Sequence, residues 1–389
     1  MEKTKICMLG CLRAYFNKTQ YNLGEDDDIK ALYNMSRSHN LAPIVFSVIK
    51  NDSVLRNNNA VYQAFENDFY DAVVRYDLQK SVIDNITDIL TKNGINHIYF
   101  KGSEIKEYYP VPELRSMGDV DLLIKTDDRS EVKKLLTQNG YELLEDNGPV
   151  YSYGKDGVLI EVHTSIVNGK VGSKDAQQYY KNAYDFAVFD GCVGRFEPTY
   201  HLAYLIVHIA HHFWFYGAGA KMILDLAVMI RHFGVDPDGV LGILEQIGLD
   251  DFAKVILSVC YKWFGMGKCY VDDTQDTEDF LINFGAFGNV NRNVGVIVRR
   301  KALEEGKKST FSAKLAFAFP SYEKMKNIPY MKFMEGRPYL LLWGWIYRFF
   351  YNIKNRRKFL FTATSDMAGD DAKQEAQKEI KYFEEIGLI

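Results

Sequence analysis

Apolar residues recur with helical spacing through the first quarter of the chain. In Asp26–Arg37 and Tyr62–Thr91 they return every three or four positions, as Val82, Ile86 and Leu90 do. This spacing places apolar side chains on one face of a helix, so it predicts helices in both stretches. We therefore expect a helical N-terminal region over residues 1–92.

The period then shortens to that of strands. His97–Phe100 is a short apolar run, Asp119–Ile124 begins with strict alternation, and Tyr141–Leu144 is a further strand candidate. Residues 150–163 read as a hairpin that turns around Gly154–Gly157. Asp128–Asn139 has helical spacing and is followed by Gly140, a usual helix stop. These elements predict a small mixed sheet with flanking helices over residues 93–197.

After Pro198 the pattern is helical again. His201–Phe215 and Lys221–His232 are predicted helices, and the polar tail Asp370–Ile389 is a predicted surface helix. Residues 198–389 are therefore expected to form a helical domain. Together the three regions predict an α+β protein.

Composition fits this picture, but charge is distributed unevenly. The 389 residues are 47% hydrophobic and 25% charged, which is typical of a globular protein and argues against disorder. The net charge of −4 disfavours a dedicated nucleic-acid binder, yet Arg299–Lys358 holds 15 Lys/Arg and only 4 Asp/Glu. This segment therefore carries +11 and the remainder −15. A polyanionic partner and a solvated helical face are equally compatible with it.

Membrane insertion and secretion are not expected from the sequence. No uncharged apolar run reaches the roughly 18 residues that span a bilayer. The N-terminal segment lacks the apolar core of a signal peptide. Five cysteines without a CxxC pair predict neither a disulfide framework nor a thiolate zinc site. These features predict a cytoplasmic protein.

Two carboxylates on one strand are the first sign of chemistry. In Asp119-Val-Asp121 the acids project from one face of the strand, while Val120 and Leu122 project from the other. Carboxylates held this close repel each other unless a cation lies between them, and hard divalent cations prefer such oxygen ligands. The Asp-x-Asp pattern alone is only a weak indication of a metal site.

The neighbouring segments strengthen that interpretation. Residues 158–163 also alternate, which places Glu161 and His163 opposite the core face and supplies a third acid. Upstream, Lys101-Gly102-Ser103 joins a strand to a helix, where glycine allows a close backbone approach and helix amides attract phosphate. Each motif is common alone, but this order of motifs is not.

At these residues the chain resembles the DNA polymerase β-like nucleotidyltransferase superfamily. It most resembles an uncharacterised bacterial nucleotidyltransferase family with a Lys-Gly…Tyr…Arg…Asp-x-Asp signature. The resemblance covers most of the chain, although only the middle motifs are specific. The matching positions are Lys101-Gly102, Tyr108 or Tyr109, Arg115, Asp119-Val-Asp121, Glu161-Val-His163, His208–His212 and Lys221…Asp225. Lys221 stands where an arginine is expected, which replaces a planar fork by a point charge.

The resemblance implies transfer of a nucleoside monophosphate from a nucleoside triphosphate (NTP), with Mg²⁺ or Mn²⁺ as cofactor. Two ions about 3.5–4 Å apart would support an in-line displacement. Asp119 and Asp121 are the expected ligands of both ions, and Glu161 is the expected ligand of one and a candidate base. The predicted nucleotide-binding residues are Lys101, Gly102, Ser103 and Arg115. The acceptor is a small molecule or a protein, with nucleic acid less favoured.

Several further residues have both structural and functional interpretations. His208 and His212 share one face of a helix. They are either hydrogen-bonded residues at the edge of its packed side, or contacts to the substrate, as His163 could also be. Lys221 and Asp225 form a helix salt bridge or contact the substrate. Arg115 pairs with Glu113 or Glu107, or binds nucleotide.

Two other classes of function stay open from sequence. The chain could be a nucleotide-binding regulatory or partner protein with the same fold and no turnover. The aromatic and basic residues 338–358 are interpreted first as a core helix with a cationic edge. They also suit base stacking or a membrane surface. The sequence does not identify the NTP or the oligomeric state.

Overall fold

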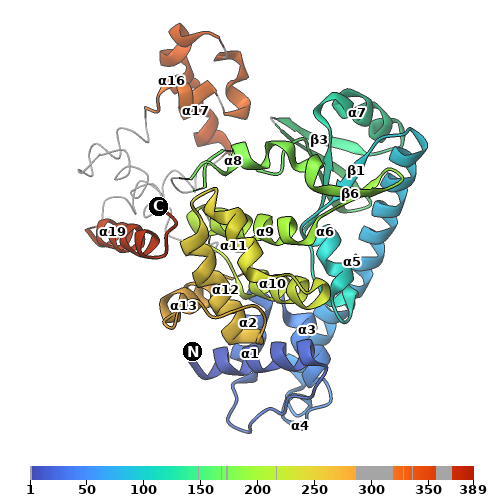
Figure 1. Cartoon of the computed structure of the whole chain (residues 1–389), viewed down its shortest axis with the longest axis vertical. Helices are drawn as coiled ribbons and strands as arrows, with labels where there is room; N and C mark the ends of the chain where they lie inside the picture. Colours follow the sequence, from blue (N-terminus) through green and yellow to red (C-terminus); the bar gives the residue numbers. More distant parts are fainter. Residues whose placement is uncertain are drawn as a thin grey trace. The chain divides into compact units, whose positions relative to one another are not determined.

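A mixed sheet with helices on both faces organises the larger of two compact units in the computed structural model (Figure 1). One unit comprises residues 1–289 and 388–389, and the other comprises residues 290–387. The predicted boundaries at residues 92 and 197 both fall inside the first unit and stay predictions. The structure describes residues 2–147, 149–167, 169–171, 174–215, 217–285, 319–326, 328–334, 336–355 and 370–389.

The N-terminal region is helical, as the apolar spacing predicts. Asp28 caps its second helix by accepting a hydrogen bond from the Ala31 amide, so this helix begins after the acidic run and not within it. Asn58 caps the long fifth helix in the same way. The five helices are α1 Glu2–Asn17, α2 Ile29–Ser38, α3 Ala42–Ile49, α4 Ser53–Arg56 and α5 Asn59–Lys92.

The sheet has seven strands in the order β3-β4-β5-β2-β1-β7-β6. The central strand β2 runs parallel to β5 and antiparallel to β1. The α+β fold with a mixed sheet is therefore as predicted. The strands are β1 His97–Tyr99, β2 Asp119–Ile124, β3 Glu142–Asn147, β4 Val150–Lys155, β5 Val158–His163, β6 Ala187–Asp190 and β7 Val193–Phe196.

The hairpin of β6 and β7 is absent from the sequence prediction. Both strands have only four residues, which is too short for alternation to stand out. Asp190-Gly191 between them is a turn signal, and Gly191 adopts a positive φ of 59°. That dipeptide was the available indication of the hairpin.

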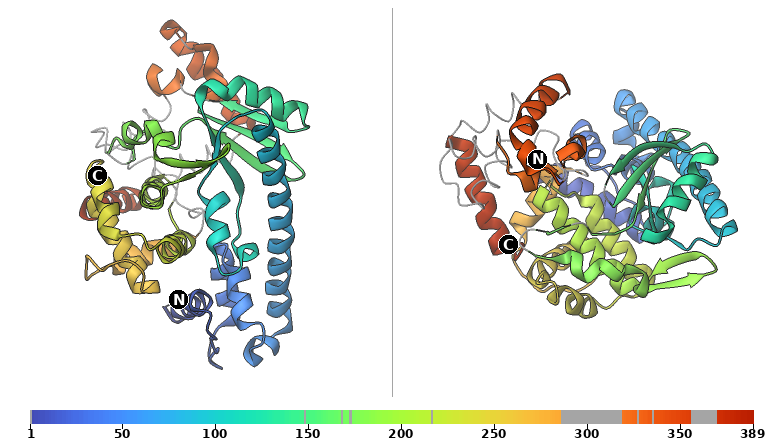
Figure 2. Two further views of the ribbon diagram at one scale, coloured as in Figure 1. Left: turned by 45° about the vertical axis from the view of Figure 1, so that its right-hand side comes forward. Right: turned by 90° about the horizontal axis from the view of Figure 1, so that it is seen from above.

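The hydrophobic core lies on one face of the sheet, beneath α5 and α7 (Arg129–Gln138). Val120 and Leu122 of β2 pack there with Ile160 of β5, Ile86 of α5 and Leu136 of α7. Figure 2 shows α5 running the length of this side of the unit. The opposite face, which carries the acids, is covered in part by α9 (Pro198–Phe215), whose Tyr204 ring contacts Phe100.

The remaining helices of the first unit follow Pro198, as predicted. Gly234 and Gly265 end two of them in the left-handed conformation, where a side chain would be strained. The helices that follow α9 are α10 Ala220–Phe233, α11 Pro237–Glu245, α12 Asp250–Phe264 and α13 Gln275–Phe284. Two short helices, α6 Gly102–Ile105 and α8 Ala176–Tyr179, lie before Pro198.

The second unit contains α16 (Tyr322–Lys326), α17 (Leu341–Asn355) and α19 (Asp370–Glu385). Its small core is a methionine cluster of Met325, Met331 and Met334. The predicted tail helix is confirmed as α19. Residues 299–318 and 356–358 of the basic segment lie outside the described residues.

The core interpretation of the aromatic segment is wrong for most of α17. Trp345 packs against the methionine cluster and donates to the Pro320 carbonyl. Trp343 is 68% exposed and Phe350 is 64% exposed. The aromatic residues surround the helix, so one buried face cannot cover them all. Among the helices that the structure describes, none has the length and apolarity needed to cross a bilayer.

We expect Val158→Ala to lower the free energy of unfolding by about 2 kcal/mol, because Val158 is a buried core residue of β5. Val188→Ala is the matched control, since Val188 lies on a strand and is 73% exposed. Urea titration of both variants measures the difference. Equal effects would contradict the placement of the core.

Candidate functional site

The register of β2 and β5 brings the predicted acids together. Asp121 is the Cα partner of Glu161 in this parallel pair, so both side chains project from the face opposite the core. His163 follows two residues later on the same face. Its Nε2 lies 3.0 Å from Asp121 Oδ1 and 3.4 Å from Glu161 Oε2.

These three residues form the candidate metal group of the described chain. One ligand atom from each of Asp121, Glu161 and His163 lies within 4.8 Å of the other two. Asp119 is outside this group, although it is on the same strand face and lines the adjacent pocket. The ligands predicted from sequence are the two aspartates and Glu161, whereas His163 is predicted only as a substrate contact.

Lys101 neutralises the centre of the site. Its Nζ lies 2.7 Å from Asp121 Oδ1, and its backbone has φ +52°, which is uncommon for a residue with a side chain. A side chain at the next position, Gly102, would force its neighbours to shift. A Cβ on Gly102 would lie 2.6 Å from Arg115 Nη1 and 3.1 Å from Met117 Cγ.

Ser103 contributes to the same junction through the backbone. Its hydroxyl oxygen accepts a hydrogen bond of 2.7 Å from the Asp121 amide, and the serine is buried. The predicted helix start at Gly102 is confirmed, but α6 has only four residues. The role of Gly102 and Ser103 in nucleotide binding stays a prediction.

Arg115 and Asp225 form a buried, bidentate ion pair. Arg115 Nε and Nη2 donate to the two Asp225 oxygens at 2.9 and 2.7 Å, and the Tyr109 hydroxyl donates at 2.6 Å. Of the two interpretations of Arg115, the pairing with Glu113 or Glu107 is therefore wrong, and nucleotide binding stays a prediction. Lys221 Nζ instead donates to the Ser116 carbonyl at 3.2 Å. These contacts join two segments that are 110 residues apart.

The long α5 holds the loop that carries Arg115. Gln79 Nε2 and Arg75 Nε donate to the Met117 carbonyl at 3.0 and 3.2 Å. Residues 110–117 are thus fixed immediately before β2, which sets the position of Asp119.

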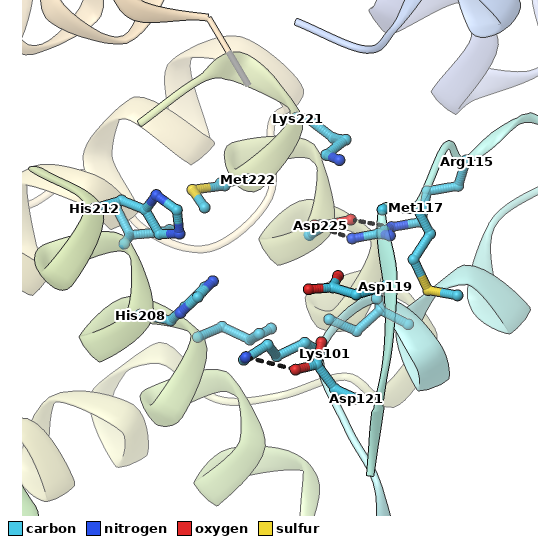
Figure 3. Close-up of a pocket in the computed structure, with 15 residues that line it drawn as sticks. Lys101, Arg115, Met117, Asp119, Asp121, His208, His212, Lys221, Met222 and Asp225 are labelled. Carbon is cyan, nitrogen blue, oxygen red and sulfur yellow. Dashed lines mark hydrogen bonds and ion pairs between the residues drawn. The ribbon is translucent and has the colours of Figure 1, made fainter. Parts of the chain in front are cut away.

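A pocket opens beside the acids (Figure 3). Asp119 points into it from β2, and His208 and His212 of α9 lie on the opposite wall. Its charged and polar lining is Lys101, Arg115, Asp119, Asp121, His208, His212, Lys221 and Asp225. Most of the residues singled out from sequence therefore share one pocket.

A second pocket shares Lys101 and His208 with the first. His163 and His211 supply its other polar groups. The rest of its lining is mainly apolar and comes from the segment after β5 and from α9: Ile166, Val167, Val171, Tyr204 and Val207. Lys101 and His208 therefore lie between a pocket lined by carboxylates and a second pocket that has no carboxylate in its lining.

The site acids titrate differently because their neighbours differ. Burial, with a contribution from Asp121, raises the pKa of Asp119 to about 6. Burial would also raise the pKa of Asp121, but Lys101 and His163 hold it below its usual value. Burial lowers the pKa of His212 to about 3 and that of His208 well below its usual value, so both imidazoles are neutral at pH 7.

A buried chain of polar contacts behind Lys101 is absent from the sequence prediction. The Lys101 amide donates to His201 Nε2 at 3.4 Å, and His201 Nδ1 lies 3.4 Å from Glu104 Oε2. Tyr108 then donates to Glu104 Oε1 at 2.7 Å. No sequence signal links Glu104 to His201, because the two residues are far apart in the chain and neither belongs to a motif.

Comparisons with known proteins identify the family. Residues 25–265, more than half of the chain, match the family described as "Uncharacterised nucleotidyltransferase". This chain therefore belongs to that nucleotidyltransferase family. No curated protein matches it.

Among solved structures, the Megavirus polyadenylate synthase is similar at 14% sequence identity and a TM-score of 0.30. The alignment covers 46% of this chain and 37% of that chain. This similarity is too low to support any conclusion about activity.

We expect Asp225→Ala to lower the free energy of unfolding by about 3–5 kcal/mol, because it leaves the Arg115 charge buried without its partner. Asp84→Ala is the control, since Asp84 pairs with Lys80 on the surface and should cost less than about 1 kcal/mol. Chemical denaturation of both variants measures the effect. An equally small change for Asp225→Ala would contradict a buried pair.

Glu104 should make stability depend on pH. Burial raises its pKa from 4.5 to about 7, so the folded protein binds a proton more tightly than the unfolded chain between these values. Stability contributed by this group is therefore lost as pH rises. Glutamine does not titrate, so the free energy of unfolding of Glu104→Gln, taken relative to that of the wild type, should increase by on the order of 3 kcal/mol from pH 5 to pH 8. Urea titrations at both pH values test this, with the exposed Glu107→Gln as the unaffected control.

Proposed function

We propose that this protein transfers a nucleoside monophosphate from an NTP to a hydroxyl-bearing acceptor. The observation that carries the proposal is the convergence of Asp119, Asp121 and Glu161 on one sheet face, where the two aspartates line a pocket that also has cationic side chains. Membership of a nucleotidyltransferase family supports it. The nucleotide, the acceptor and the metal dependence are the proposed parts.

The donor set fits a divalent cation. Asp121 and Glu161 offer carboxylate oxygens within 4.8 Å of each other and of the His163 ring, and Asp119 adds a carboxylate on the same face. Mg²⁺ or Mn²⁺ bound here would stabilise charge on the attacking and leaving oxygens. Asp119, Asp121 and Glu161 would hold it.

The cationic side chains then bind the triphosphate. Lys101 and Lys221 line the pocket and offer ammonium groups to phosphate oxygens. Arg115 lines the pocket too, but its Nε and Nη2 already donate hydrogen bonds to the Asp225 carboxylate. Arg115 therefore acts mainly by holding Asp225 and the loop before β2, with Nη1 nearest to Gly102.

In the transfer step the acceptor oxygen forms a bond to the α-phosphorus. The bond from that phosphorus to the α,β-bridging oxygen breaks, and pyrophosphate leaves with the electron pair. Glu161, whose side chain is 29% exposed, accepts the hydroxyl proton and passes it to water. The second pocket, which has no carboxylate in its lining, offers space for the acceptor, which is a small molecule or a protein side chain.

A second candidate is nucleotide binding without turnover, in a regulatory or partner protein. The buried ion pair between Lys101 and Asp121 favours it, since a lysine already neutralises the central acid. The two candidates differ in whether label leaves the nucleotide.

Incubation with each of four α-labelled NTPs, Mg²⁺ or Mn²⁺ and a cell extract tests the proposal. We expect label from at least one NTP in a protein or small-molecule fraction, and little in RNA. Asp121→Asn should reduce transfer at least about 100-fold, because it removes a central carboxylate charge. The surface variant Asp84→Asn should transfer label as the wild type does.

Two outcomes would contradict the proposal. Tight nucleotide binding with no transfer of label would favour the regulatory protein. Full activity in Asp121→Asn would remove the assigned role of the carboxylates.

A further inference from the structure

We propose that His163 is a direct metal ligand and that the site therefore prefers Mn²⁺ to Mg²⁺. This inference rests on the proposed function for the presence of a cation, and it refines which residues bind that cation. The imidazole of His163 replaces one of the carboxylates that the Asp-x-Asp pattern suggested.

The first argument is the placement of the ring. His163 follows Glu161 by two residues on β5, and Glu161 is aligned with Asp121 on β2, so all three side chains share one sheet face. The ring of Phe100 meets the His163 ring edge-to-face, with centroids 5.1 Å apart and an interplanar angle of 79°. The imidazole is buried and held in one orientation before any ligand binds.

The second argument is the spacing of the donor atoms. Adjacent ligands around an octahedral cation, each about 2.1 Å from the metal, are about 3.0 Å apart. His163 Nε2 lies 3.0 Å from Asp121 Oδ1 and 3.4 Å from Glu161 Oε2. The His163 nitrogen hydrogen-bonds to Asp121 when no metal is bound, and this separation equals the one that neighbouring ligands of one ion require. Asp119 is not part of this group.

The third argument is the chemistry of the donors. Mg²⁺ prefers a shell made only of oxygen. Mn²⁺ shares the preference for carboxylate oxygen, but as a first-row transition metal it binds imidazole nitrogen more readily than Mg²⁺ does. Two carboxylates and one imidazole suit Mn²⁺, which accepts both kinds of ligand in octahedral geometry. Lys101 Nζ contacts the same Asp121 oxygen at 2.7 Å, so either cation must compete with the lysine. This competition affects both ions and does not explain a preference between them.

The experiment measures metal binding without any acceptor. Electron paramagnetic resonance titrates Mn²⁺ into the full-length protein, with and without a non-hydrolysable NTP analogue, and Mg²⁺ is then added as a competitor. We expect Mn²⁺ to bind at least tenfold more tightly than Mg²⁺. Electron spin-echo modulation of the bound Mn²⁺ should show directly coordinated ¹⁴N from an imidazole.

His163→Asn is the diagnostic variant, because asparagine keeps a polar side chain and offers oxygen in place of nitrogen. It should lose the ¹⁴N signal and bind Mn²⁺ at least tenfold more weakly, while Mg²⁺ affinity changes less than threefold. His232→Asn is the control, since His232 is exposed and lies outside the metal group. Its Mn²⁺ affinity and ¹⁴N signal should equal those of the wild type.

Several outcomes would overturn the inference. These are Mn²⁺ bound without ¹⁴N coupling, unchanged affinity in His163→Asn, or no Mn²⁺ binding even with the nucleotide analogue. The wild-type spectrum decides the matter even if the variant does not fold. If Mn²⁺ binds through His163 but no NTP is turned over, the inference stands and the proposed transfer activity fails.

Discussion

The carboxylate of Asp121, buried at the centre of the sheet, is the charge around which the site is built. A buried carboxylate is costly unless charged and hydrogen-bonding partners surround it. Here Lys101 and His163 contact the same oxygen at 2.7 and 3.0 Å, and the Ser103 hydroxyl accepts from the Asp121 amide. Lys101 and Ser103 come from the junction of β1 and α6, and His163 comes from β5, so the contacts of this one residue of β2 fix the junction of β1, β2, β5 and α6.

A second buried charge pair fixes the opposite wall. Asp225 on α10 accepts hydrogen bonds from Arg115 and Tyr109, and these bonds connect α10 to the segment before β2. The pocket beside the two pairs has charged side chains from β2, from α10 and from the segments that precede α6 and β2, and neutral histidines from α9. Under the proposed function, a metal ion and the phosphates of the nucleotide would bind next to these charged groups.

The strand pattern made the central part of the site predictable. Alternation along β2 and β5 correctly separated Val120 and Leu122, which enter the core, from Asp121 and Glu161, which do not. The family resemblance pointed to His208 and His212 of α9 and to Lys221 and Asp225 of α10, and all four residues line the pocket. The β6–β7 hairpin was not predicted, because four-residue strands carry too little periodic signal.

The sequence by itself determined which residue types lie on each face of each element, because side-chain direction follows the local period. It thereby determined the fold class and the presence of an acidic strand pair with a third acid. Only the tertiary structure decided the partners: Arg115 with Asp225, His201 with Glu104, and His163 with Asp121. Such pairings depend on how distant segments pack, and no local pattern encodes the distance between atoms 40 to 110 residues apart.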